Sequence, residues 1–383
     1  MIMKIKTQSF SIKSPFPGSV FPLELNDSGA YRQITSYAFR IGLLIPMCGS
    51  AGLWAPSCIA SAQIAVAEVN NRGGILDRKV ELIMIDAALE AATPVEEVIN
   101  SLIEIGAIDA IVGMHISAVR QKLSKIVNQR VPYIYTPLYE GGENTKGIFA
   151  IGDTPSRQLG PALEYLQNMH HFKKWALIGN DYVWPRSSNS FAKSKLKDLG
   201  VDICYERYIP FGISDMSSII KDIKNSKAEA VLISLVGQDA VTFNRAFGNL
   251  KGLHNIVRLS CAIEENGLLA SGQGNLHEMY SASSYFGSLR TSANDNFRER
   301  YHNFHGDCAP VLNAIGVSTY EGVQFLHELL KMHPNDWKNK GSQDVYSLKF
   351  ASVKTSDEDS HGNIHPMYIA KANGIFFEIL DNI

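Results

Sequence analysis

Short apolar runs alternate with longer stretches of helical spacing through most of this chain. An apolar run that stops at glycine or proline is typical of a buried strand, whereas apolar residues three or four positions apart predict a helix. We expect strands at 39–45, 80–85, 110–112, 133–135, 149–151, 175–178, 201–208 and 230–236, with helices between them. Strands that alternate with helices in this way predict parallel sheets that are covered on both faces.

The strand-and-helix pattern restarts after the turn at Gly152–Pro155. A chain of 383 residues is also too long for one ordinary hydrophobic core. Together these observations predict an α/β fold of two doubly wound parallel-sheet lobes with a cleft between them.

Composition narrows the class of protein. Apolar residues make up 45% and charged residues 19% of the chain, which is the balance of a soluble globular protein. The net charge of −2 offers no basic surface for nucleic acid or for an anionic membrane. The five cysteines are widely spaced and include no C-x-x-C pair, which argues against a disulfide framework or a zinc site.

The sequence lacks the usual signatures of catalysis. No H-E-x-x-H, Walker or G-x-S-x-G motif occurs. His302 and His305 stand three positions apart, but we interpret them as side chains of a surface helix. Cys48 follows a strand, and nothing adjacent to it would lower the pKa of its thiol. We therefore predict a binding protein that is not an enzyme and that uses no metal or cofactor.

Residues 1–37 form an extension ahead of the first lobe, and the sequence leaves open whether it is ordered. The extension contains no apolar segment of the roughly 7–15 residues that a secretory signal requires. We therefore expect a cytoplasmic protein. The alternative is a periplasmic or other extracytoplasmic protein whose signal peptide is missing from this start.

The stretch after the strand at 175–178 is crowded with aromatic and hydrogen-bonding side chains. Ligands of open α/β sheets sit beyond the carboxyl ends of the strands. Tyr182 and Trp184 offer a phenol and an indole N–H at such an end, and in an extended loop they would point the same way. We expect a loop at 179–186 that holds a small ligand, with Arg186 paired to an acidic neighbour.

Several pieces of the chain resemble the type I periplasmic-binding-protein superfamily. The sequence is most similar to the amide sensors of aliphatic amidase operons and to the urea and short-amide binding proteins of ABC transporters. The pieces that carry this resemblance are 67–74 (AEVNNRGG), 112–120 (VGMHISAVR), 135–141 (YTPLYEG), 179–189 (GNDYVWPRSSN) and 236–238 (VGQ). They occur in the family's order and extend over about two thirds of the chain.

The resemblance implies two lobes that are joined by three crossovers, so that each lobe is discontinuous in sequence. The first lobe would comprise 38–152 plus 287–335, and the second lobe 153–286 plus 336–383. The chain departs from the family near Phe350, where a proline-glutamine-glycine turn is absent. We interpret the acidic stretch at 356–361 as a solvated loop.

The resemblance also implies which side chains face the ligand. They are Ser117, Tyr135 and Pro137 in the first lobe, and Tyr182, Trp184, Gln238 and Glu264 in the second. Two competing interpretations stay open at this point. Ser117 could be a simple helix N-cap, and Glu264 or Glu265 could be a carboxylate at a helix start instead of the partner of a ligand ammonium.

From the resemblance we predict a cytoplasmic sensor that closes on a short aliphatic amide or urea and thereby regulates a transcription antiterminator. The alternative is the extracytoplasmic substrate-binding protein of an ABC transporter for urea, short amides, or branched-chain or small amino acids. Neither interpretation includes direct contact with nucleic acid or a membrane span, and both allow a homo-oligomer.

Overall fold

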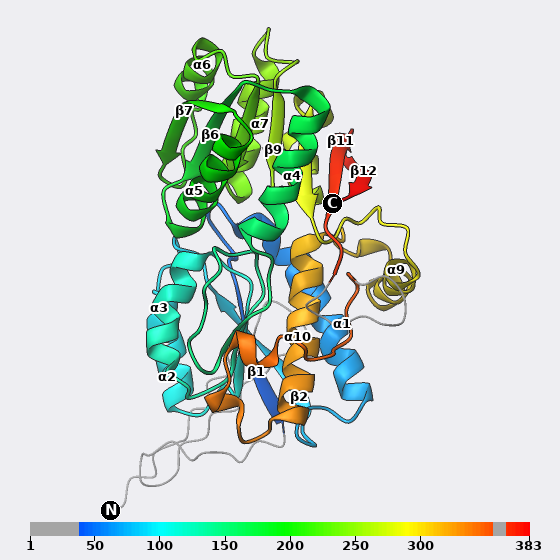
Figure 1. The fold of residues 1–383 in the computed structure, drawn as a ribbon. Helices are drawn as coiled ribbons and strands as arrows, with labels where there is room; N and C mark the ends of the chain where they lie inside the picture. Colours follow the sequence, from blue (N-terminus) through cyan, green and yellow to red (C-terminus); the bar gives the residue numbers. More distant parts are fainter. Residues whose placement is uncertain (1–37, 355–364) are drawn as a thin grey trace, which may run out of the picture.

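The computed structural model describes residues 38–354 and 365–383, which form two α/β lobes stacked end to end (Figure 1). The predicted two-lobed α/β fold with parallel sheets is confirmed. Our predictions for the N-terminal extension and for the acidic stretch at 356–361 lie outside the described residues.

The first lobe is built on a five-stranded sheet in the order β2-β1-β3-β4-β5, in which every pair is parallel. Its central strands are almost wholly buried because helices cover both faces, as the continuous apolar runs of the sequence require. The strands are β1 (Ala38–Ile45), β2 (Lys79–Asp86), β3 (Ala110–Gly113), β4 (Tyr133–Tyr135) and β5 (Ile148–Ala150).

The helices of the first lobe come from both ends of the chain. Helix α10 packs along α1 and against β3 and β4, although it follows all three far later in the sequence (Figure 1). The helical segments are η1 (Gly52–Trp54), α1 (Ala55–Asn71), α2 (Val95–Glu104), α3 (Ser117–Val127), α9 (Ser292–His305), η3 (Gly306–Cys308), α10 (Ala314–Met332), η4 (Trp337–Asn339) and η5 (Ser342–Val345).

The second lobe contains a seven-stranded sheet in the order β12-β11-β10-β9-β8-β6-β7. Strands β6 to β10 pair in parallel, whereas the C-terminal hairpin joins as an antiparallel edge. The strands are β6 (Lys174–Asn180), β7 (Asp202–Ile209), β8 (Ala230–Ser234), β9 (Val257–Ser260), β10 (Met279–Ser283), β11 (Tyr368–Asn373) and β12 (Phe376–Asn382). Its helices are α4 (Pro155–His170), α5 (Val183–Asp198), α6 (Ser217–Asn225), α7 (Gly237–Asn249), α8 (Glu265–Ser271) and η2 (Gln273–Asn275).

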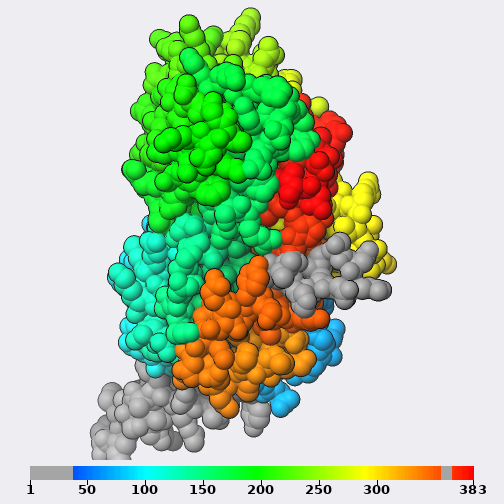
Figure 2. Space-filling view, viewed as in Figure 1, coloured from blue at the N-terminus to red at the C-terminus, as the bar shows by residue number. Residues whose placement is uncertain are grey.

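The chain passes between the lobes three times, after β5, after β10 and before β11. Figure 2 shows the C-terminal hairpin on the upper lobe and the segment that follows α10 on the lower lobe. The resemblance assigned this segment to the second lobe, but its Trp337 and Val345 are buried and the backbone N–H of Ala150 on β5 donates to Ser342 Oγ at 2.9 Å. The lobe boundaries otherwise stay a prediction.

The expected loop at 179–186 is mostly regular structure. Residues 179 and 180 complete β6, and helix α5 begins at Val183. Tyr182 has the extended backbone of an N-cap residue, and Pro185 falls in the first turn, where its missing N–H costs no hydrogen bond. The proline was a helix-start signal, and the prediction of a loop was wrong for this reason.

Candidate functional site

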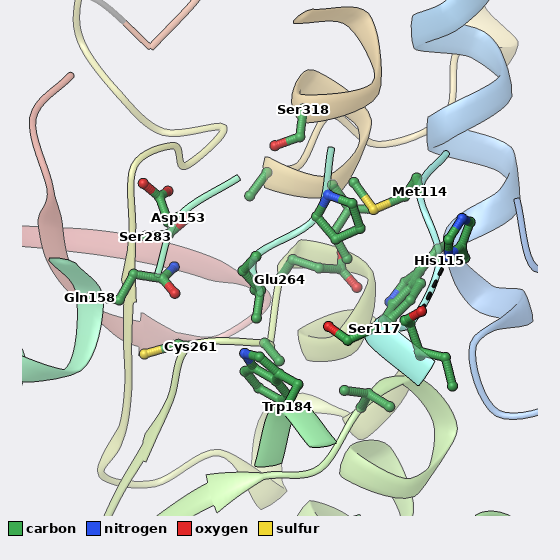
Figure 3. A pocket seen from close by; sticks show the side chains of 18 of the residues that line it. Met114, His115, Ser117, Asp153, Gln158, Trp184, Cys261, Glu264, Ser283 and Ser318 are labelled. Atoms are coloured by element: carbon green, nitrogen blue, oxygen red, sulfur yellow. Dashed lines mark hydrogen bonds between the residues drawn. The ribbon is translucent and has the colours of Figure 1, made fainter. Parts of the chain in front are cut away.

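A cavity lies between the lobes, at the carboxyl ends of strands from both sheets (Figure 3). It opens to solvent and contains about 700 Å³ of atom-free space when the open mouth is included. Six of the seven residues that we predicted from the sequence line it: Ser117, Tyr135, Pro137, Tyr182, Trp184 and Glu264.

The wall from the first lobe carries a pair of hydroxyl groups. Tyr135 Oη donates to the backbone oxygen of His115 at 2.8 Å and lies 3.3 Å from Ser117 Oγ. Ser117 is the first residue of α3, whose N-cap is Ile116, so the interpretation of Ser117 as an N-cap is wrong. Its side chain lines the cavity.

Buried neighbours hold the Tyr135 ring in place. The guanidinium of Arg120 lies 5.0 Å from the ring centroid and pairs with Glu140 at 2.7 Å and with Glu143 at 3.2 Å. The centroid of the His115 ring lies 5.2 Å from the centroid of the Tyr135 ring. Burial lowers the pKa of His115 to about 4, so its imidazole is neutral at physiological pH and adds no charge to the site.

The wall from the second lobe is aromatic. The rings of Tyr182 and Trp184 lie with their centroids 6.4 Å apart at the start of α5, and Trp184 is buried. Phe211 supports the other face of Tyr182, with ring centroids 5.4 Å apart. Arg186, in the same helix turn, forms the expected ion pair with Asp181 at 2.7 Å.

Glu264 is the buried acid of the cavity. Its carboxylate accepts from the backbone N–H of Asn266 at 2.7 Å, which makes it the N-cap of α8, and from Asn313 Nδ2 at 2.9 Å. Burial, with the neighbouring charge of Glu265, raises the pKa of Glu264 to about 8. Glu264 is therefore a carboxylate at a helix start and also lines the cavity. The interpretation as a helix-start residue and the interpretation as the partner of a ligand ammonium are compatible.

Gln238 does not line the cavity. Its side chain is exposed, on the first turn of α7, while its backbone N–H points toward the first lobe and donates to the Ser50 oxygen at 2.6 Å. The predicted amide contact from this residue is absent because the helix start turns the side chain to solvent.

Sequence reasoning missed other residues of the cavity, among them Trp54, Asp153, Gln158 and Ile315. Trp54 could have been found, because it follows the strand at 39–45 and the strand-end rule applies there equally. Asp153 belongs to a crossover, Gln158 to the first turn of α4 and Ile315 to α10, so only the docking of the lobes brings them together at the site.

Three helices begin at the wall of the cavity. Helices α3, α5 and α7 have no side-chain hydrogen bond at the N-cap, and the cap residues Ile116, Tyr182 and Val236 all line the cavity. At α7 the N–H of Gln238 is already paired with Ser50. The helix dipole and the N–H groups of a first turn favour a negative or strongly accepting ligand group at such ends.

The described residues contain neither a metal-binding cluster nor a membrane-spanning helix. In the ranges 38–354 and 365–383, no group of three or more His, Cys, Asp or Glu side chains is arranged to hold a metal ion. No helix in those ranges has the length and apolar character needed to cross a bilayer.

The described fold and sequence are similar to known binding proteins. A family model described as "Periplasmic binding protein" matches residues 38–374. A Leu/Ile/Val-binding protein, BraC3 of Rhizobium johnstonii, is 26% identical over 206 residues, which cover 53% of this chain and 56% of that protein. The chain thus matches about half the length of this curated relative.

Solved structures with the same fold cover nearly the whole chain. LivJ of Streptococcus pneumoniae, a branched-chain amino acid transporter substrate-binding protein in complex with isoleucine, has a TM-score of 0.75 at 18% identity and covers 90% of this chain and 99% of its own. A solute-binding protein of an ABC transporter from Rhodopseudomonas palustris, in complex with p-hydroxybenzoic acid, has a TM-score of 0.76 at 17% identity, with coverage of 90% and 97%.

Proposed function

This chain belongs to the periplasmic binding protein family, a family of binding proteins and not of enzymes, and we propose that it is the solute-binding protein of an ABC transporter. Its ligand is a small carboxylate with an apolar body, and an aliphatic amino acid fits best. The proposal includes a permease as the partner and an extracytoplasmic location. The names of the relatives support both parts.

One observation carries the choice of ligand: the cavity combines an acceptor-binding end with a buried acid. The open N–H groups at the start of α3 and the Ser117 hydroxyl can donate to a carboxylate. Glu264, in the wall formed by the second lobe, can accept from an ammonium. Trp184 and Ile315 supply apolar surface between the polar groups.

The amide-sensor interpretation is the second candidate. The pieces at 135–141 and 179–189 favour it, since they resemble the branch of amide sensors. The buried carboxyl of Glu264 in the cavity favours the first candidate, because a neutral amide carries no ammonium to pair with it. The names of the relatives also support a transport receptor better than a cytoplasmic sensor.

A thermal-shift and calorimetry panel tests the proposal with isoleucine, norvaline, benzoate, acetamide and urea. A ligand that binds only the folded protein stabilises it by about 2.7 kcal/mol at a hundredfold excess over Kd. We expect a carboxylate to raise the unfolding temperature and the amides to leave it unchanged. A response to acetamide or urea alone would favour the sensor, and no response to any compound would refute both candidates.

A further inference from the structure

The cavity has a second polar end that the proposed function does not use. In Figure 3, Asp153, Gln158 and Ser283 lie on the opposite side of the cavity from Ser117, with Glu264 and Trp184 between the two ends. These three residues come from the crossover after β5, the first turn of α4 and the end of β10. We call these three residues, together with Ser284, the distal subsite.

Asp153 is a fixed acceptor in the distal subsite. It is buried, and its carboxylate accepts from Ser284 Oγ at 2.6 Å and from His365 Nε2 at 3.0 Å, with Arg157 at 3.3 Å. A carboxylate has about four acceptor positions, so the three donors among residues 38–354 and 365–383 leave room for one more. The side chain lines the cavity, and a ligand donor is the group that can reach that position.

Gln158 adds a second acceptor. It is buried, and its Nε2 lies 3.4 Å from the backbone oxygen of Ala282. Within the described residues its Oε1 accepts no hydrogen bond. One of the two N–H groups on the nitrogen is used on the backbone, and the oxygen is the acceptor that a ligand donor can pair with.

The hydroxyl groups near these acceptors differ in how their protons are used. Ser284 donates its proton to Asp153, whereas Ser283 accepts from the backbone N–H of Tyr285 at 3.3 Å and Ser318 accepts from Lys354 Nζ at 2.9 Å, so these two keep a proton to donate. What distinguishes the distal end from the Ser117 end is its pair of buried acceptors, the Asp153 carboxylate and the Gln158 amide oxygen. An apolar ligand tail here would leave buried acceptors unpaired, which is unfavourable.

We propose that the distal subsite binds a hydrogen-bond donor on the far side of the ligand. Resting on the proposed function, this narrows the ligand class to small carboxylates that carry a hydroxyl, amide N–H or amino group remote from the carboxylate. Gln158 is a specificity-determining residue in this proposal. A site built to pair such a group rejects an analogue that lacks it.

Two matched pairs of compounds test the distal subsite by calorimetry on the full chain: 4-hydroxybenzoate with benzoate, and 5-hydroxynorvaline with norvaline. We expect the hydroxylated member of at least one pair to bind about tenfold or more tightly than its partner. Gln158→Met keeps the side-chain length and removes the acceptor, so the ratio of the two affinities within each pair should move toward one.

Gln167→Met is the matched control, because Gln167 is on the same helix and bonds the Phe172 oxygen outside the cavity. It should keep the wild-type preference. Equal binding within both pairs, or an unchanged preference in a folded Gln158→Met, overturns the proposal while the proposed function stands. If no carboxylate binds the wild type, the proposed function fails and the subsite with it. The wild-type comparison decides even if the variant does not fold.

Discussion

The backbone N–H of Gln238 donates to the backbone oxygen of Ser50 across the mouth of the cleft, at 2.6 Å. Ser50 follows β1 in the first lobe, and Gln238 begins α7 in the second. The close approach depends on Gly237, whose φ of +54° is left-handed and whose missing side chain leaves room for the Ser50 oxygen. The lobes therefore touch at a backbone contact that any side chain at position 237 would disturb.

Gly237→Ala should prevent the lobes from closing fully. A Cβ at this position would lie 2.0 Å from the Ser50 oxygen, a backbone atom that cannot move alone. A protein that must close on its ligand then binds less tightly, because only the closed state has contacts from both lobes. We expect the affinity for the best ligand of the panel to fall by about tenfold or more, and small-angle scattering to show a larger radius of gyration.

Gly212→Ala is the control for backbone strain. Gly212 is in the same lobe and has a φ of +78°, but a Cβ there meets no atom within 4 Å. This variant should lose some stability for the same conformational reason and retain wild-type affinity. Equal losses of affinity in the two variants would contradict the role of the Ser50 contact.

Binding of an amino acid should depend on pH through Glu264. The pKa of this carboxyl is raised to about 8 by burial and by Glu265, so at neutral pH the acid must lose a proton before it can pair with an ammonium. Affinity should therefore rise with pH, by up to about tenfold per unit below pH 8, and level off above it. Calorimetry in buffers of different ionisation enthalpy would detect the released proton.

Glu264→Gln should flatten this pH profile and lower the affinity for amino acids. The unliganded wild type should also lose stability as pH rises from the ordinary pKa of a glutamate toward 8, since the unfolded chain ionises there and the folded chain does not. An amino-acid affinity that is independent of pH in the wild type would show that Glu264 does not pair with the ammonium.

Asp153→Asn should destabilise the protein at its hinge, the place where Asp153 and His365 from two crossovers meet. Burial by itself raises the pKa of this carboxyl, but the charges of His365, Lys354 and Arg157 outweigh burial and hold the pKa well below its usual range. Removing one partner of such a buried cluster costs about 3–5 kcal/mol of unfolding free energy, measured by urea denaturation. Because a lowered carboxyl pKa stabilises the folded protein above the unfolded pKa, the difference between the two proteins should begin to shrink below about pH 4 and continue to shrink as the pH falls toward the lowered pKa of the folded state.

Asp336→Asn is the matched control, since Asp336 pairs with Lys340 on the surface. Solvent screens this pair, so the urea midpoint should stay that of the wild type. A similar loss in both variants would mean that the hinge cluster has no special effect on stability.

Arg120→Met should weaken ligand binding although Arg120 does not itself line the cavity. Arg120 stacks on the Tyr135 ring and neutralises Glu140 and Glu143, so its loss leaves two buried carboxylates uncompensated beside the site. We expect a lower unfolding temperature and at least about a tenfold loss of affinity. Arg120→Lys should recover part of the stability but less of the affinity, because an ammonium lacks the planar fork.

Arg186→Met is the corresponding control, as Arg186 also pairs with a carboxylate and stacks on a tyrosine, but at the surface. It should leave both the unfolding temperature and the affinity unchanged. Wild-type binding by a folded Arg120→Met would show that Tyr135 needs no support from this side.

The sequence by itself predicted the strands β1 to β8 and their order, because apolar runs and turn residues act over a few positions. The strand at 133–135 was predicted with the bounds that the structure has, and six of seven proposed site residues line one cavity. The start of α5 was missed although Pro185 signalled it.

Tertiary structure alone decided how the two ends of the cavity are made. Asp153 and His365 are in contact only because separate crossovers meet at the hinge, and Gln238 bonds Ser50 only because two lobes dock. The antiparallel edge from β11 and β12 also completes a sheet that began far earlier in the chain. Local patterns determine which face of an element is apolar, but the partners of its polar ends depend on how distant segments pack, and no periodicity along the chain records that.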